Sequence, residues 1–203
     1  MDLDQWNSDR KDHLHQQDSR RHMIETGRLK DTDAMQDLLE EELNQIDWPR
    51  ETDASFEVDS GGELVMIDVD LPEVEDIPDQ EATVAARGLK INVKTKSAAK
   101  RLIEYMTHIH AIAFRVIGLT FGVLPIVNNV VISGYSQRAD AATGNISDDY
   151  LFSIRVDRTE WTNLNFGNLS EIDLSACLGN FDIRRKMTKT GIITSINPFE
   201  SAD

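Results

Sequence analysis

The chain has 203 residues, a formal net charge of −15 at pH 7 and a hydrophobic content of 40%. This length suits one domain with an extension or two small domains, and the composition is ample for a hydrophobic core. The single cysteine, Cys177, excludes an internal disulfide and favours a cytoplasmic compartment, and the large negative charge opposes a general affinity for nucleic acid.

The charge is divided sharply along the chain. Residues 1–81 contain 25 acidic and 7 basic residues, whereas residues 82–203 contain 11 acidic and 14 basic residues. The balances are therefore −18 and +3. Two oppositely charged halves either dock on each other or contact different partners.

Two helices are expected before residue 49, and together they predict an acidic helical hairpin over residues 1–48. Residues 3–26 are polar and resemble an exposed helix that needs external support. The second helix is expected to begin at Asp33 and to end before Pro49. Its apolar residues recur at helical spacing and must be covered by the later domain or by a second copy of the chain. These candidate partner-binding residues are Met35, Leu38, Leu39, Leu43 and Ile46.

Strands and one long helix are expected in residues 54–199. Residues 55–58 and 63–71 read as a hairpin, residues 72–86 as an acidic loop and residues 89–94 as a strand with one basic face. A long apolar helix is expected from Ser97 to about Phe121, followed by strands at 127–133 and 150–157, a short helix near 169–178 and a basic tail. This order predicts an α+β domain with a mostly antiparallel sheet packed on one central helix.

No membrane partner is expected. The apolar run over residues 111–127 contains Arg115 and Pro125 and is shorter than the roughly 20 residues that a bilayer-spanning helix needs. A buried core helix is the better interpretation.

A metal-dependent nuclease site is one candidate. Asp68 and Asp70 lie on one face of a strand, and Lys94 lies on a strand that we expect to be its neighbour. Carboxylates that hold Mg²⁺ or Mn²⁺ and a lysine that steadies the phosphate would suit phosphodiester hydrolysis. The layout resembles nucleases of the PD-(D/E)xK type, but Asn92 stands where an acid would precede the lysine. The alternative is an ordinary strand with a solvated face.

A basic cluster near the C-terminus is a second candidate, for phosphate or nucleic acid. It comprises Arg184, Arg185, Lys186 and Lys189, with Arg155 and Arg158 nearby. The alternative is docking against the acidic loop 73–81. The polar residues 134–149 form a third candidate, a long loop between two strands.

Other chemistry is not indicated. His108 and His110 are two positions apart on a helix and diverge by about 200°, so they cannot share a metal. No metal site is expected, and no cofactor other than Mg²⁺ or Mn²⁺ under the nuclease hypothesis. Cys177 lies in an apolar run and is expected to be a buried, inert thiol.

Residues 47–52 and the segments 131–138, 187–191 and 197–199 resemble the C-terminal region of uncharacterised bacterial proteins that carry domains of unknown function. The resemblance spans about three quarters of the chain and implies a bacterial cytosolic setting without an established activity. The favoured hypothesis is a non-enzymatic interaction protein that associates with itself or another protein through its N-terminal helices. A nuclease and a nucleic-acid-binding protein are the alternatives.

Overall fold

A computed structural model describes residues 31–48, 52–84, 88, 90–139 and 143–200, with six scattered positions between residues 10 and 21. Most of the expected first helix, and with it the helical hairpin, lies outside the described residues.

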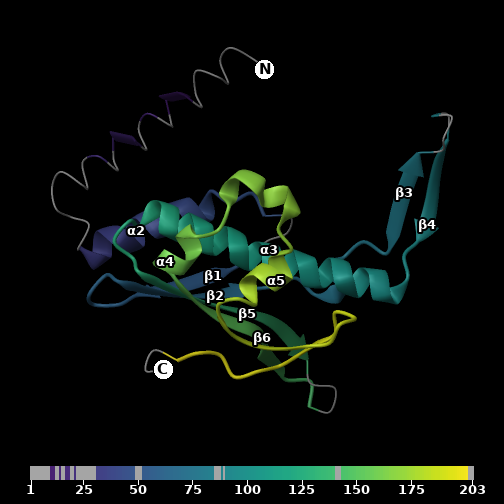
Figure 1. Ribbon diagram of the computed structural model, residues 1–203. Coiled ribbons are helices and arrows are strands. Elements are labelled where there is room, and N and C mark those ends of the chain that lie inside the picture. The colour runs from purple at the N-terminus through teal and green to yellow at the C-terminus, as the bar shows by residue number, and fades with distance from the viewer. Residues whose placement is uncertain are drawn as a thin grey trace.

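The body is a mixed α and β structure built on a mostly antiparallel sheet and a long central helix, as expected (Figure 1). The sheet has six strands in the order β1-β2-β5-β6-β7-β8. The one parallel pair among them is β2 with β5. The strands are β1 (Ala54–Val58), β2 (Leu64–Asp70), β5 (Asn129–Ala139), β6 (Ile146–Asp157), β7 (Asp182–Met187) and β8 (Ile193–Thr194).

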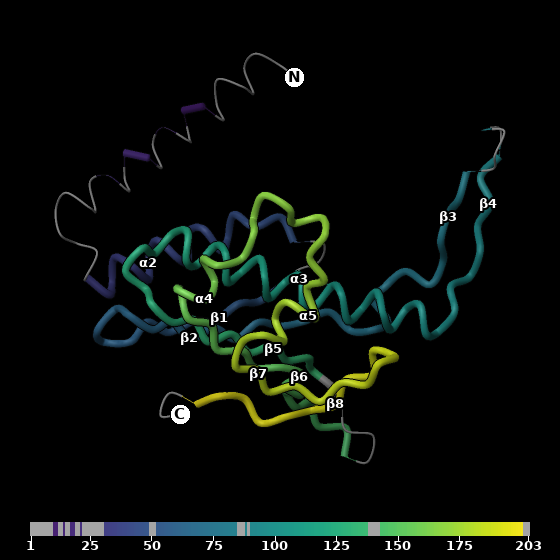
Figure 2. The backbone as a smooth tube through the Cα atoms, in the orientation of Figure 1, coloured from purple at the N-terminus to yellow at the C-terminus, as the bar shows by residue number. Residues whose placement is uncertain are grey.

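Helices cover one face of this sheet (Figure 1). They are α2 (Thr32–Asn44), α3 (Ala98–Val123), α4 (Arg158–Thr162) and α5 (Leu174–Leu178), with the 3-10 turns η2 (Val74–Asp76) and η3 (Phe166–Glu171). The C-terminal segment 195–200 crosses the opposite face, which we call the open face (Figure 2).

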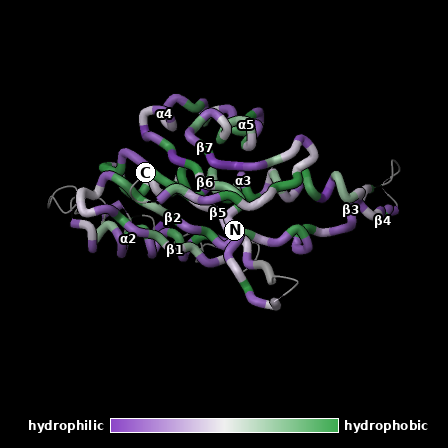
Figure 3. The backbone as a smooth tube through the Cα atoms, turned by 90° about the horizontal axis from the view of Figure 1, so that it is seen from below, coloured by the Kyte–Doolittle hydropathy of each residue, from purple (hydrophilic) through white to green (hydrophobic). Residues whose placement is uncertain are grey.

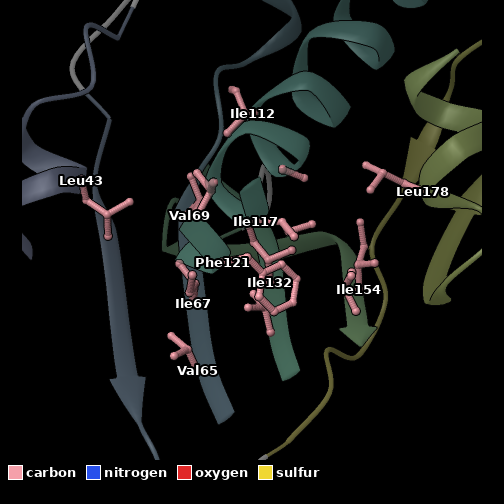
Figure 4. Packing of buried hydrophobic residues seen from close by; sticks show 14 of the residues in the cluster. Leu43, Val65, Ile67, Val69, Ile112, Ile117, Phe121, Ile132, Ile154 and Leu178 are labelled. Atoms are coloured by element: carbon pink, nitrogen blue, oxygen red, sulfur yellow. The ribbon is translucent and has the colours of Figure 1, made fainter. Parts of the chain in front are cut away.

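Alternation along β2 sets the two faces of the sheet. Val65, Ile67 and Val69 are buried toward α3, and Asp68 and Asp70 point to the open face. Figure 4 shows side chains from α3, β2, β5 and β6 meeting between the layers. The core therefore lies between the sheet and α3.

The central helix α3 begins at its expected cap, where the Ser97 side chain accepts a hydrogen bond from the backbone N–H of Lys100. Within the described residues it is the single helix long and apolar enough to cross a membrane. Half of its most apolar window is buried inside the protein, which a core helix also shows.

The helix α2 docks on the body of its own chain. Its N-cap is Asp31, two positions before the expected Asp33, because the Asp31 side chain accepts from the N–H groups of Asp33 and Ala34. The apolar stripe packs against α3 and β1 as part of the common core. Met35, Leu39, Leu43 and Ile46 are buried and Leu38 is half-buried. The sequence allowed the stripe to be covered by the later domain or by a second copy of the chain, and in the structure the chain's own body covers it.

A second, two-stranded sheet projects from the body (Figure 1). It consists of β3 (Gln80–Val84) and β4 (Ile91–Thr95), and β3 occupies part of the segment expected to be an acidic loop. We call residues 80–96 the arm. The arm and α3 together form the connection between the parallel strands β2 and β5.

The expected loop 134–149 is largely strand. The pairing of β5 with β6 continues to Ala139 and Ile146, with an irregularity between Gly134 and Tyr135. The polar residues that suggested a loop belong to a long hairpin, in which solvent-facing polar side chains are normal.

Candidate interaction surfaces

The structure does not bring Lys94 to the two aspartates. Asp68 and Asp70 lie on β2, whose neighbours are β1 and β5, whereas Lys94 lies on β4 in the separate sheet of the arm, opposite Glu81. The expectation that β4 neighbours β2 was therefore wrong. Among the described residues there is also no group of three His, Cys, Asp or Glu side chains that could hold a metal ion.

Asp68 lies in a hollow on the open face instead. Its carboxylate accepts a hydrogen bond from the Tyr150 hydroxyl at 3.1 Å. Burial raises the pKa of Asp68, although hydrogen bonds from Tyr150 and Ser133 act in the opposite direction. The hollow is about 650 Å³ and is bounded by β1, β2 and the C-terminal segment, with Glu57 and Glu200 also at its wall. It combines carboxylates with one phenol, which does not suit phosphate binding.

The basic C-terminal cluster is divided between two environments. Neighbouring residues on a strand point to opposite faces, so Arg184 points to the open face and Arg185 points toward α3. Arg185 is held by His110 and Ser175, whereas Lys186 and Lys189 are exposed to solvent. These residues do not form one continuous basic patch.

The two additional arginines of that candidate patch have structural contacts. Arg184 and Arg155 both lie over the Phe199 ring, with guanidinium carbons 4.0 and 4.7 Å from the ring centroid, respectively. Arg158 donates hydrogen bonds to the carbonyls of Phe121, Leu124 and Val127, at the end of α3 and just beyond it. Arg155 therefore contacts the C-terminal segment, whereas Arg158 binds the end of α3 and the turn after it.

Cys177 and His110 were also considered in the sequence, and both are buried in the structure. Cys177 is buried on α5, and burial raises the pKa of its thiol, as suits an inert group. His110 is fully buried, and its two ring nitrogens contact Met106 and Arg185.

The arm exposes an apolar face. Val84 lies opposite Ile91, and Ala82 lies opposite Val93, so these four side chains share one side of the ribbon. Val84, Ile91 and Val93 are 70, 66 and 59% exposed, respectively. A two-stranded sheet is marginally stable in water by itself. An exposed apolar face on such a ribbon is an unusual feature.

The base of the arm is fixed to α3 by two ion pairs. Lys100 pairs with Glu81 on β3, and Lys96 pairs with Glu104 at 2.6 Å. The opposite face of the ribbon carries polar side chains, with Lys94 beside Asn92. Residues 80–96 contain four bases and one acid, so the arm is locally basic in an acidic protein.

A groove lies near the other end of α3. Its volume is about 440 Å³. Gly118 and Gly122 lie four residues apart on the same face of the helix and form the floor of the groove, where they contribute no side chains. Aromatic rings from α3, α4 and η3 line it, with Phe114 and Trp161 centroids 4.7 Å apart and Trp161 and Phe166 centroids 5.6 Å apart. Phe166 is 42% exposed. The groove is therefore apolar, and its remaining lining residues are Arg115, Phe121, Arg158 and Thr162.

Sequence reasoning missed both surfaces. The sequence did contain a signal for the arm. Apolar residues alternate with polar ones on either side of Gly88, at Ala82, Val84, Ile91 and Val93, as in two short strands joined by a turn. Gly88 has a φ of +67°, a value that favours glycine in such a turn. No sequence pattern indicated the groove, because its residues come from three elements and local periodicity does not predict how these elements pack together.

No family model, no curated protein and no solved structure matches this chain.

Proposed function

We propose that this protein is a non-enzymatic assembly protein of the cytosol, which associates with further copies of itself through the β3–β4 arm. The observation that carries the proposal is the exposed apolar face of the arm, formed by Val84, Ile91 and Val93. The N-terminal stripe that first suggested self-association is buried in the chain's own core, so the arm takes its place.

The magnitudes support this assignment. Complete burial of one Val or Ile side chain contributes about 1.5–3 kcal/mol, so the three side chains at about two-thirds exposure contribute roughly 3–6 kcal/mol. Association costs at least about 4 kcal/mol in lost freedom of motion. The arm is therefore strong enough to direct association but needs further contacts for a tight complex.

The test is the mass in solution as a function of concentration, by light scattering and sedimentation velocity. Wild type should exceed the monomer mass of 22.9 kDa as concentration rises. The double variant Ile91→Thr, Val93→Thr should stay monomeric, because threonine keeps the β-branched shape but adds a hydroxyl. Ile146→Thr is the matched control, since Ile146 is 70% exposed on β6 and outside the arm. A wild-type monomer at every concentration would end the proposal.

The nuclease alternative has a separate test. We expect no cleavage of plasmid or oligonucleotides with Mg²⁺ or Mn²⁺, because Lys94 lies on the arm and not beside Asp68 and Asp70. Metal-dependent cleavage that Asp70→Ala abolishes would restore it. Binding of nucleic acid through Lys186 and Lys189 would require an affinity that falls steeply with salt.

A further inference from the structure

We infer that the arm of one copy docks into the aromatic groove of a second copy, so that the copies join head to tail. The inference rests on the proposed function and names the surface that the arm meets. It concerns the groove lined by Phe114, Trp161 and Phe166.

Geometry excludes insertion of the arm into the groove of its own chain. The arm joins α3 at residue 96 and the groove follows residues 114–122 of that helix, so about 27–39 Å of helix separate them. The strands of the arm have five residues each and span about 17 Å. The arm also extends away from the body, at the end opposite α2 and α4 (Figures 1 and 3). The groove within reach is that of another molecule.

The two surfaces match in polarity and shape. The arm is a narrow convex ribbon with aliphatic side chains on one face, and the groove is a concave surface lined mainly by aromatic rings and glycine. Its volume of about 440 Å³ lies within the roughly 300–1,000 Å³ of ligand pockets. The charged residues of the groove are Arg115, which lies over the Trp48 ring, and Arg158, whose positive charge faces the dipoles of three carbonyl groups.

The surroundings of the two surfaces carry opposite net charge. The segment that follows α2 adjoins the groove, because Arg115 of the groove lies over the Trp48 ring at 5.9 Å. Residues 31–48 contain seven acids and no base, and Glu160 is exposed beside Trp161 on α4. The arm, with four bases and one acid, has the opposite net charge, and its Lys94 lies on the polar face of the ribbon, away from the groove. Complementary charges of this kind favour the pairing and set its direction.

Two different surfaces in contact make a heterologous interface, which repeats from copy to copy and gives a ring or an open filament. An arm that paired with a second arm would give a closed dimer instead. The choice between these arrangements can be measured.

The experiment is complementation between two variants. The arm variant is Ile91→Thr, Val93→Thr. The groove variant is Gly122→Leu, which fills the groove floor, where no atom lies within 4 Å of an added Cβ. A second groove variant, Phe166→Ser, removes one exposed wall and protects the test against a folding defect in the first. Circular dichroism and the melting temperature establish that each variant is folded.

Wild type should grow beyond a dimer with concentration, and each variant alone should remain monomeric. An equimolar mixture should form a complex of two copies and stop there, because one intact arm and one intact groove remain. Raising NaCl from about 50 to about 500 mM should weaken wild-type association, because salt screens the attraction between the basic arm and the acidic surface.

A groove variant that associates like wild type would overturn the inference while leaving the proposed function intact, since the arm would then meet another surface. A mixture that stays monomeric would also overturn it. A wild type that never associates would remove the proposed function as well.

Discussion

Arg185 on β7 donates a hydrogen bond from Nη1 to Nε2 of His110 on α3, over 2.5 Å. The other ring nitrogen, Nδ1, lies 2.6 Å from the Met106 carbonyl. A guanidinium cannot accept a hydrogen bond, so Nε2 is the acceptor and Nδ1 carries the proton. The pair joins the sheet to the central helix through a neutral imidazole.

This arrangement predicts a loss of stability in weak acid. Burial and the nearby Arg185 charge lower the pKa of His110 from 6.5 to about 4, although the Met106 hydrogen bond and Asp173 act in the opposite direction. Between these values the unfolded chain binds a proton that the folded chain does not, so stability falls as pH falls from about 6.5 to about 4. The loss is roughly 3 kcal/mol.

Urea unfolding at several pH values measures the effect. His110→Gln is the comparison, because it lacks the titrating group and should show a shallower dependence between pH 4 and pH 6.5. An imidazole that titrates near pH 6.5 in the folded protein would contradict the prediction.

Gly134 has no room for a side chain. An added Cβ would lie 2.5 Å from Cζ of Phe152 and 2.6 Å from Cδ1 of Leu71, both of which are buried. Gly134→Ala should therefore destabilise the fold by about 1–3 kcal/mol. Gly122→Ala is the matched control, because nothing lies within 4 Å of its added Cβ and the position is helical. It should be neutral or stabilising by up to about 1 kcal/mol. Chemical denaturation of both variants distinguishes the two cases.

Phe199 should hold the C-terminal segment on the open face. Its N–H donates to Ser153 Oγ at 3.0 Å, and the Pro198 carbonyl accepts from Arg184 at 2.8 Å. In Phe199→Ala the segment should detach, and backbone amides near 196–199 should exchange with solvent faster. The loss of stability should stay below the roughly 3–5 kcal/mol of a core Phe→Ala change, since local release replaces global unfolding. Hydrogen exchange measured by mass spectrometry tests this, with the exposed Asn197→Ala as control. Unchanged exchange would contradict it.

Arg158 should stabilise the end of α3 and the turn after it. Its Nε, Nη1 and Nη2 atoms reach three carbonyls at 2.5, 3.0 and 2.6 Å, respectively. Arg158→Lys keeps the charge but replaces the planar fork with one ammonium group, which cannot satisfy all three. We expect a loss of about 2 kcal/mol or more, visible as a lower melting temperature. A melting temperature equal to that of wild type would show that water replaces the guanidinium.

Much of the body could be predicted because its signals are local. The alternation of Val65, Ile67 and Val69 predicted a strand with one buried face, and the spacing of apolar residues after Ser97 predicted the central helix. Both depend on the residue's own segment, where periodicity and capping chemistry apply. The structure agrees on both elements.

The local pattern carries no information about contacts between distant segments, on which the site hypotheses depended. Nothing in the strand of Lys94 tells which strand lies beside it, and β4 pairs with β3 and not with β2. The stripe that includes Met35 and Leu39 fitted two coverings equally well. Arg184 and Arg185 are adjacent in sequence, but the sheet places them on opposite faces.

The position of the arm within the connection from β2 to β5 bears on how such a protein can change over time. The parallel strands β2 and β5 pair directly in the main sheet, and the ribbon of β3 and β4 is an additional element in the connection between them. Insertions, deletions and replacements there would leave the hydrophobic centre untouched. The same rigid body can consequently carry interchangeable attachments, and a new binding specificity needs only a new ribbon.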